Sequence, residues 1–179
     1  ADTLKNRLKR HSSGKMENGD GEVDDLELGI DTIKRRSEGL LKFAETYRNL
    51  NKITAPTLKR VYVRDLFENL NNLMQPTLEQ KKIELEIILK DPDLGVQVDP
   101  NLIEQVLINL LVNAIEAVKE KDHARIVLAG YIAKNKRTII KVSDNGMGIP
   151  EELMDKIFIP FFSTKKSGSG IGLSLCKQI

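Results

Sequence analysis

The stretch Ser143-Asp144-Asn145-Gly146-Met147-Gly148-Ile149-Pro150 decides the fold, because it places a carboxylate between an expected strand and two glycines. The residues before it, 138–142, are apolar and β-branched, which favours a strand. Pro150 and the two glutamates after it are typical of a first helical turn. Asn-Gly also suits a hairpin, but no second strand pattern follows, so the hairpin is the weaker interpretation. A carboxylate at this strand end can accept a hydrogen bond from an amino group of a flat ligand, which the glycines let approach the backbone.

A leucine-rich helix is expected before this stretch, from Asp99 to about Lys119. Apolar residues recur there at helical spacing, and Asp99-Pro100 is a typical start, with a side-chain cap followed by proline at the first position. Four polar residues form one line along this helix, namely Gln105, Asn109, Asn113 and Glu116. Such a line usually faces water, yet lysine and glutamate suit a solvated face better than asparagine does. We therefore predict that the line faces a ligand.

A glycine-rich loop follows the aromatic run Phe158-Ile159-Pro160-Phe161-Phe162. It reads Ser163-Thr164-Lys165-Lys166-Ser167-Gly168-Ser169-Gly170-Ile171-Gly172-Leu173 and leads into a helical pattern that continues to Ile179. A glycine loop entering a helix presents free backbone N–H groups, which suits phosphate, although Gly/Ser stretches are more often simple linkers. The loop is not a P-loop, since G-x-x-x-x-G-K-[ST] is absent from the chain, and no strand directly precedes its glycines as a dinucleotide fingerprint requires.

Taken in this order, the three features resemble the ATP-binding domain shared by gyrase, heat-shock chaperones, MutL-type mismatch-repair proteins and histidine kinases. The asparagine box corresponds to residues 109–117, the first glycine box to 144–150, the phenylalanine box to 158–164 and the second glycine box to 168–173. The resemblance covers roughly residues 60–179 and implies an α/β sandwich with helices on one face of a mixed sheet.

One position separates the branches of this superfamily. The water-activating ATPases carry a glutamate as general base four residues before the metal-binding asparagine, whereas this chain carries Asn109 there. A general base must take a proton near the working pH, and an amide cannot. The resemblance therefore favours a histidine kinase, in which the phosphoryl group is held for a nucleophile other than water.

The resemblance also implies a role for individual residues. Asp144 would bind the adenine amino group, and Asn113 would ligate Mg²⁺, a hard ion that prefers oxygen. Thr164, Lys165 and the N–H groups of 168–173 would close over the phosphates. The implied catalytic residues are Asn109, Asn113 and Lys165. The residues implied in ATP binding are Asn109, Asn113, Ala117, Asp144, Gly146, Met147, Gly148, Ile149, Thr164, Lys165, Gly168, Ser169, Gly170, Ile171, Gly172 and Leu173.

Residues 1–53 are expected to form a helical hairpin, with the end of one helix in 1–10, a loop over 11–21 and a long amphipathic helix over 23–50. Near-heptad spacing predicts that the hairpin is half of a homodimeric four-helix bundle, although an ordinary core helix is the simpler alternative. The fold class is thus α+β, with the hairpin followed by an ATP-binding domain over 54–179. Parts of 31–56 also resemble NtrY-like nitrogen-regulation kinases.

Further secondary structure follows from local patterns. Strands are expected at 58–63, 83–89, 96–98, 124–133 and 137–142, with a helix at 64–80 that contains Pro76. The turn at Asn135 is expected to join the last two strands as a hairpin.

The histidines depart from the family pattern. Family members carry a phosphoacceptor histidine followed by an acid on the first hairpin helix, and neither His11 nor His123 fits this motif. We therefore expect the acceptor and the last strands of the family fold to lie outside this sequence, and this fragment to bind ATP without phosphorylating itself. The resemblance implies a response-regulator receiver domain as the next acceptor. A protein-serine kinase of the same superfamily and a degenerate nucleotide-binding dimerisation module are the alternatives.

Composition limits the remaining possibilities. A chain of 179 residues is long enough for two modest domains, and its single Cys176 excludes an internal disulfide and suits a reducing compartment. No apolar run reaches about 18 residues, so we expect this fragment to make no membrane contact. A net charge of +2 implies no nucleic-acid binding. The resemblance implies a cytoplasmic fragment of a protein anchored in the inner membrane.

Overall fold

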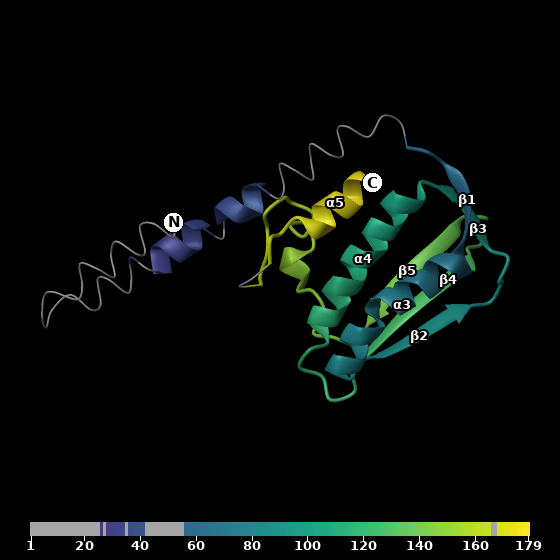
Figure 1. Cartoon of the computed structure of the whole chain (residues 1–179), viewed down its shortest axis with the longest axis horizontal. Coiled ribbons are helices and arrows are strands. Elements are labelled where there is room, and N and C mark those ends of the chain that lie inside the picture. The colour runs from purple at the N-terminus through teal and green to yellow at the C-terminus, as the bar shows by residue number, and fades with distance from the viewer. Residues whose placement is uncertain (1–25, 27, 35, 42–55, 166–167) are drawn as a thin grey trace, which may run out of the picture. The chain divides into compact units, whose positions relative to one another are not determined.

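The computed structural model describes residues 26, 28–34, 36–41, 56–165 and 168–179 (Figure 1). The chain divides into two compact units, residues 1–54 and 55–179. In the first unit the described residues are helical, and Leu26, Ile33 and Leu40 expose more than half of their surface. The rest of the expected hairpin, residues 1–25, 27, 35 and 42–53, lies outside the described residues. No helix in the described part of the chain is both long and apolar enough to cross a bilayer.

The second unit contains a mixed three-stranded sheet and a separate antiparallel pair of strands. The mixed sheet has the order β2-β4-β5, in which β2 is parallel to β4 and β4 is antiparallel to β5. Its strands are β2 (Glu84–Leu89), β4 (Arg125–Ile132) and β5 (Thr138–Asp144), and the pair consists of β1 (Lys59–Tyr62) and β3 (Gly95–Val98). All five expected strands are present, and the mixed sheet of the expected fold class is confirmed.

The turn between β4 and β5 forms the expected hairpin. Lys136 adopts a positive φ of 63°, and Ala133 N–H donates to the Arg137 carbonyl. The Asn135 side chain accepts a hydrogen bond from Arg137 N–H, which fixes the turn from within. This short-range chemistry explains why the sequence alone located the hairpin.

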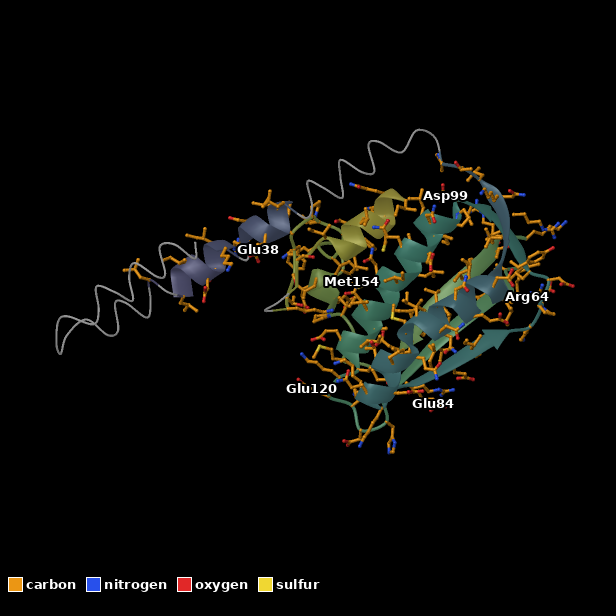
Figure 2. The ribbon with its side chains drawn as sticks, viewed as in Figure 1. Glu38, Arg64, Glu84, Asp99, Glu120 and Met154 are labelled. Carbon is orange, nitrogen blue, oxygen red and sulfur yellow. The ribbon has the colours of Figure 1, made fainter. Side chains whose placement is uncertain are left out.

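Two long helices cover the mixed sheet, and Figure 1 shows α3 (Val63–Lys81) in front of it with α4 (Pro100–Ala117) alongside. Helix α3 contains Pro76, and Lys82, the residue that caps its C-terminal end, adopts a left-handed conformation. Asp99 begins α4 as expected (Figure 2), because its Oδ1 accepts hydrogen bonds from the N–H groups of Asn101 at 3.0 Å and Leu102 at 3.4 Å.

The helices and the sheet enclose one hydrophobic core. Its largest fully buried side chains come from both helices, the turn after α4 and strand β4, and each contributes about 1.5–3 kcal/mol by leaving water. They are Val63, Phe67, Leu70, Leu111, Val118, Ile126 and Leu128. The apolar stripe predicted for α4 therefore faces the sheet, which turns the opposite polar line away from the core.

One element differs from its prediction. The segment after the first glycine box forms only the three-residue 3₁₀ turn η1 (Glu151–Leu153) instead of an α-helix. Pro150 precedes this turn instead of occupying its first position, and its carbonyl accepts from Leu153 N–H over 3.0 Å. The i→i+3 bonding pattern is typical of such short pieces, which rarely continue beyond one turn.

Candidate functional site

Asn145 fixes the first glycine box to the neighbouring strand. Its Oδ1 accepts a hydrogen bond from Arg125 N–H at 2.9 Å, and its Nδ2 donates to the His123 carbonyl at 2.7 Å. No second strand follows, so the hairpin interpretation of Asn145-Gly146 is wrong. Instead, the chain after β5 is held to the beginning of β4 by these two hydrogen bonds of the Asn145 side chain.

Asp144 is the last residue of β5 and lies opposite Ile126 of β4. The side chain is exposed, and its Oδ1 accepts a hydrogen bond from Gly146 N–H over 2.9 Å. This bond holds the carboxylate at the sheet edge, where a ligand can reach it.

The two glycines of this box, Gly146 and Gly148, are required for different structural reasons. A Cβ on Gly146 would lie 2.5 Å from the carbonyl oxygen of Ala117, so the box runs directly against the C-terminal end of α4. Gly148 has a φ of +71°, which disfavours other residues, and open space surrounds its missing Cβ. The structure thus gives Gly146 a packing role and leaves the backbone at Gly148 accessible. Met147, between them, exposes 81% of its surface, and Ile149 exposes 50%.

The asparagines of α4 face the second glycine box and the lysine before it. Lys165 Nζ donates to Asn113 Oδ1 over 3.1 Å. A Cβ on Gly172 would lie 3.6 Å from Asn109 Oδ1, which is ordinary van der Waals contact. The Nδ2 atom of Asn109 is buried and has no hydrogen-bond partner among the described residues. A buried amide donor without a partner is expensive, and such exceptions commonly mark functional positions.

Glu116, at the end of the polar line, pairs with Lys119 instead. Lys119 Nζ lies 2.7 Å from Glu116 Oε1, and this hydrogen bond is the main cause that lowers the pKa of the carboxyl. Both side chains are substantially exposed, so the pair contributes little to stability. That the line of Gln105, Asn109, Asn113 and Glu116 faces a ligand stays a prediction.

The phenylalanine box and the second glycine box meet through their backbones. Phe161 N–H donates to the Gly170 carbonyl over 2.9 Å, and both residues have a φ of +68°. A Cβ on Gly170 would lie 2.5 Å from the Phe161 carbonyl carbon, so only glycine fits there. For phenylalanine this left-handed conformation costs about 1–2 kcal/mol, a strain of the kind that clusters at functional sites.

The seven-residue helix α5 (Gly172–Gln178) begins at the end of the second glycine box. Ile171 and Leu175 are buried, as the helical pattern predicted, and Ser174 Oγ donates to the Ile171 carbonyl over 2.8 Å. Cys176 is half-buried, and its Sγ donates to the Val106 carbonyl of α4 over 3.7 Å. Burial raises the pKa of this thiol, and the Asn109 side chain lowers it in part.

The contacts divide the expected site residues into two groups, which are joined by α4. Asn109, Asn113, Lys165 and Gly172 form the first group, and Ala117, Asp144 and Gly146 form the second. Thr164, Gly168 and Ser169 are exposed on the segment that carries Lys165. The sequence did not predict the contacts of three residues, Asn145, Phe161 and Cys176. Only the contact of Asn145 could have been expected, because an asparagine side chain readily bonds to backbone groups at a strand end.

Comparison with known proteins agrees with this arrangement. Residues 98–179 match the family described as histidine kinase-, DNA gyrase B- and HSP90-like ATPases. The chain is 32% identical over 161 residues to sporulation kinase D of Bacillus subtilis (strain 168), and 32% identical over 150 residues to the signal transduction histidine-protein kinase AtoS of Escherichia coli (strain K12). These alignments cover 89% and 84% of this chain but only 31% and 23% of the two relatives. The chain thus spans less than a third of each relative.

Solved structures agree as well. The catalytic domain of histidine kinase ThkA is 34% identical, with a TM-score of 0.60 over 68% of this chain and 78% of that domain. ThkA in complex with the response regulator protein TrrA is 26% identical, with a TM-score of 0.68 over 98% of this chain and 49% of that one. The expected superfamily is confirmed, whereas the narrower NtrY-like resemblance stays a prediction. The chain belongs to the histidine kinase-, DNA gyrase B- and HSP90-like ATPases, and among them to the sensor histidine kinases.

Proposed function

We propose that this chain is the catalytic portion of a two-component sensor kinase, which binds Mg²⁺-ATP and presents the γ-phosphoryl group to a histidine. The observation that carries the proposal is the contact of Lys165 with Asn113 and of Gly172 with Asn109. These contacts bring the second glycine box and its preceding lysine to the two asparagines, the combination that phosphate binding needs.

The phosphates would lie between α4 and the second glycine box. Lys165 supplies a positive charge there, and the buried Asn109 Nδ2 supplies a donor that has no partner among the described residues. Charge neutralisation and positioning are the main means by which proteins catalyse phosphoryl transfer. Thr164, Gly168, Ser169, Gly170, Ile171 and Leu173 would surround the same groups.

The adenine would lie at the other end of α4. Asp144 would accept a hydrogen bond from the exocyclic amino group, while Gly146, Met147, Gly148 and Ile149 would border the base. Ala117, against which Gly146 packs, is eight residues or about 12 Å along the helix from Asn109. The two groups of residues are thus separated along one helix, as the two ends of an extended nucleotide are.

The residues present fit a magnesium ion. Asn113 offers a hard amide oxygen, and that atom already accepts a hydrogen bond from the Lys165 ammonium, itself a cation. Within the described ranges no three His, Cys, Asp or Glu side chains gather as a metal cluster. A single protein oxygen suits Mg²⁺, which usually keeps several waters and binds substrate phosphates. When bound, the ion would neutralise phosphate charge.

Asn109 favours transfer to a protein over hydrolysis. Its amide cannot take a proton from water, so it provides no general base beside the phosphates. A histidine imidazole is itself a nucleophile and needs no such base. That a histidine is the phosphoryl acceptor is inferred from relatives that are named as histidine kinases. That an aspartate of a receiver domain is the next acceptor is inferred from ThkA, which was solved with a response regulator.

Three further features are proposed from the resemblance. Residues 1–53 would pair with a second copy in a four-helix bundle, ahead of an ATP-binding domain at 54–179. The acceptor histidine would belong to the full-length protein. That protein would be anchored in the inner membrane, with this portion on the cytoplasmic side.

Nucleotide titration and a labelling experiment test the proposal. Isothermal titration should show Mg²⁺-ATP binding to the chain and its loss in Asp144→Ala. With γ-labelled ATP, the full-length protein should acquire acid-labile label, whereas this chain alone should not. No ATP binding by the wild-type chain would favour a degenerate binding module. Acid-stable label on a serine would indicate a protein-serine kinase. Acid-labile label on this chain alone would refute the prediction that it lacks the acceptor histidine.

A further inference from the structure

Three hydrogen bonds attach Asn145 to the residues that begin β4. Its backbone N–H donates to the Arg125 carbonyl over 3.2 Å, and its side-chain Oδ1 accepts from Arg125 N–H at 2.9 Å. Its Nδ2 donates to the His123 carbonyl at 2.7 Å. An asparagine amide offers one acceptor and one donor atom, and here the partner backbone uses both of them. The residue that directly follows Asp144 is therefore fixed by its side chain as well as by its backbone.

The segment to which Asn145 is attached is itself held in place. Ala124, which lies between the two partners of Asn145, is buried. Its carbonyl accepts a hydrogen bond from Glu84 N–H at the beginning of β2, over 2.9 Å. Residues 123–125 are thus tied both to the core and to the neighbouring strand, so Asn145 is bound to a point that cannot easily move.

The attachment of Asn145 fixes the group that holds the Asp144 carboxylate. Gly146 N–H belongs to the peptide bond that directly follows Asn145, and it donates to Asp144 Oδ1 over 2.9 Å. On the other side of this peptide, a Cβ on Gly146 would lie 2.5 Å from the Ala117 carbonyl oxygen. The peptide is therefore held from both sides. Its N–H binds one carboxylate oxygen of Asp144 and leaves the other, Oδ2, for a ligand.

We propose that Asn145 is a positioning residue for base recognition, which sets the direction of the Asp144 carboxylate from the beginning of β4. Asn145 itself does not touch the base; it acts through the Gly146 N–H group on Asp144. A carboxylate held in one direction selects an amino group over a carbonyl, so Asn145 contributes to the preference for adenine over guanine. The identity of the base rests on the proposed function, whereas the positioning of Asp144 does not.

Hydrogen exchange tests the positioning without nucleotide. The Gly146 amide, followed by nuclear magnetic resonance, should exchange about tenfold faster in Asn145→Ala than in wild type, because its bond to Asp144 opens more often. Asp144→Ala, which removes the acceptor, gives the rate of the unbonded amide. Unchanged exchange of Gly146 in Asn145→Ala would overturn the proposal.

Asp99→Ala is the matched control for a general loss of stability. Asp99 caps α4, and removing such a cap destabilises a protein by an amount similar to the loss of a hydrogen bond or two. Its described side-chain hydrogen bonds go to the N–H groups of residues 57, 101 and 102, none of which belongs to the first glycine box. The exchange of Gly146 should therefore stay close to wild type in Asp99→Ala. An equal acceleration in both variants would reduce Asn145 to a structural residue.

The ratio of ATP to GTP affinity gives the functional readout. Titration calorimetry should show this ratio lowered by about three- to tenfold in Asn145→Ala, the scale of one weakened hydrogen bond. In Asp99→Ala the two affinities should change together or not at all, so their ratio should stay at the wild-type value. An unchanged ratio in Asn145→Ala would contradict a role in base recognition.

A double-mutant cycle shows whether Asn145 acts through Asp144. In the Asp144→Ala background, Asn145→Ala should not change the affinity ratio further, whereas additive losses would overturn the proposal. If circular dichroism shows Asn145→Ala unfolded, Asn145→Asp decides in the same way. It keeps the acceptor for Arg125 N–H and loses the donor to the His123 carbonyl, and its added charge acts on both nucleotides alike. If the wild-type chain binds no ATP, the proposed function fails, and the exchange experiment still decides the positioning.

Discussion

Lys165 Nζ donates a hydrogen bond to Asn113 Oδ1 over 3.1 Å and so joins two segments that lie 52 residues apart in the sequence. An ammonium and a metal ion cannot share one amide oxygen at close range. If Asn113 Oδ1 held Mg²⁺, Lys165 would therefore have to exchange this partner for another, such as the phosphates. This exchange makes Asn113 the residue at which magnesium dependence should be measured.

Asn113→Ala should remove the magnesium dependence of ATP binding. We expect affinity in Mg²⁺ to fall by about tenfold or more, the effect of losing one direct metal ligand. Affinity in EDTA should remain close to that of wild type. Titration calorimetry under both conditions measures the two affinities, with Asn101→Ala, an exposed asparagine at the start of the same helix, as control. An equal loss with and without Mg²⁺ would show that Asn113 is not the metal ligand.

Asp144→Ala should weaken ATP binding by about 10- to 100-fold, the range for losing a hydrogen bond to a charged group. Wild type should also prefer ATP to GTP, since guanine offers a carbonyl where adenine offers an amino group. The side chain is exposed and its one described bond is to Gly146 N–H, so the melting temperature should change little. Asp155→Ala, an exposed carboxylate nearby in sequence, is the control. Equal ATP and GTP affinities in wild type would contradict the role of Asp144.

Local patterns were enough to locate most of the fold. Asp99 was recognised as a helix cap, and the turn at Asn135 as a hairpin, because the chemistry of each lies within a few residues. Alternation and helical spacing likewise located the strands and both long helices to within a few residues. The two α4 asparagines were singled out for the same reason, as residues that do not suit a solvated helix face.

Contacts between distant segments were not visible in the sequence. Gly146 was expected to admit a ligand, yet its tightest neighbour is the Ala117 carbonyl at the end of α4. The left-handed Phe161 depends on its backbone bond to Gly170, and Cys176 depends on the packing of α5 against α4. Asn145 was considered only as a turn residue, because its partners His123 and Arg125 are about twenty positions away.

Asn145→Ala should destabilise the second unit by about 1–2 kcal/mol, since it removes one hydrogen bond to Arg125 N–H and one to the His123 carbonyl. Urea unfolding monitored by circular dichroism measures this loss. Asn101→Ala, which removes an exposed asparagine from the start of α4, should remain within about 0.5 kcal/mol of wild type. If the unfolding free energy of Asn145→Ala also stayed within about 0.5 kcal/mol of wild type, the two Asn145 hydrogen bonds would contribute nothing to stability.

Gly146→Ala should be far more damaging than Gly172→Ala. The new Cβ would lie 2.5 Å from backbone at Ala117 in the first case and no closer than 3.6 Å to the Asn109 side chain in the second. We expect a loss of about 1–3 kcal/mol for Gly146→Ala, because rigid backbone must shift. Gly172→Ala should be neutral or slightly stabilising, since alanine is the better helix former. Equal urea midpoints for the two variants would refute the close approach of the box to α4.

Cys176 should titrate at a higher pH in the folded chain than in the unfolded one. Burial, the largest cause, raises the pKa of the thiol. The folded state then holds this proton more tightly. The stability that the protonated thiol contributes is complete at a pH below the pKa of Cys176 in the unfolded chain. It is lost as the pH rises through the pKa of Cys176 in the folded chain. Stability should therefore decline in the alkaline range.

Alkylation measures this shift directly, because Cys176 is the only cysteine and the thiolate is the reactive form. The rate of reaction with iodoacetamide, followed from neutral to alkaline pH, should reach its midpoint at a higher pH in buffer than in urea. Chain unfolded in urea provides the reference at each pH, and Cys176→Ala provides the background. Coinciding midpoints would show that the thiol is not buried against α4.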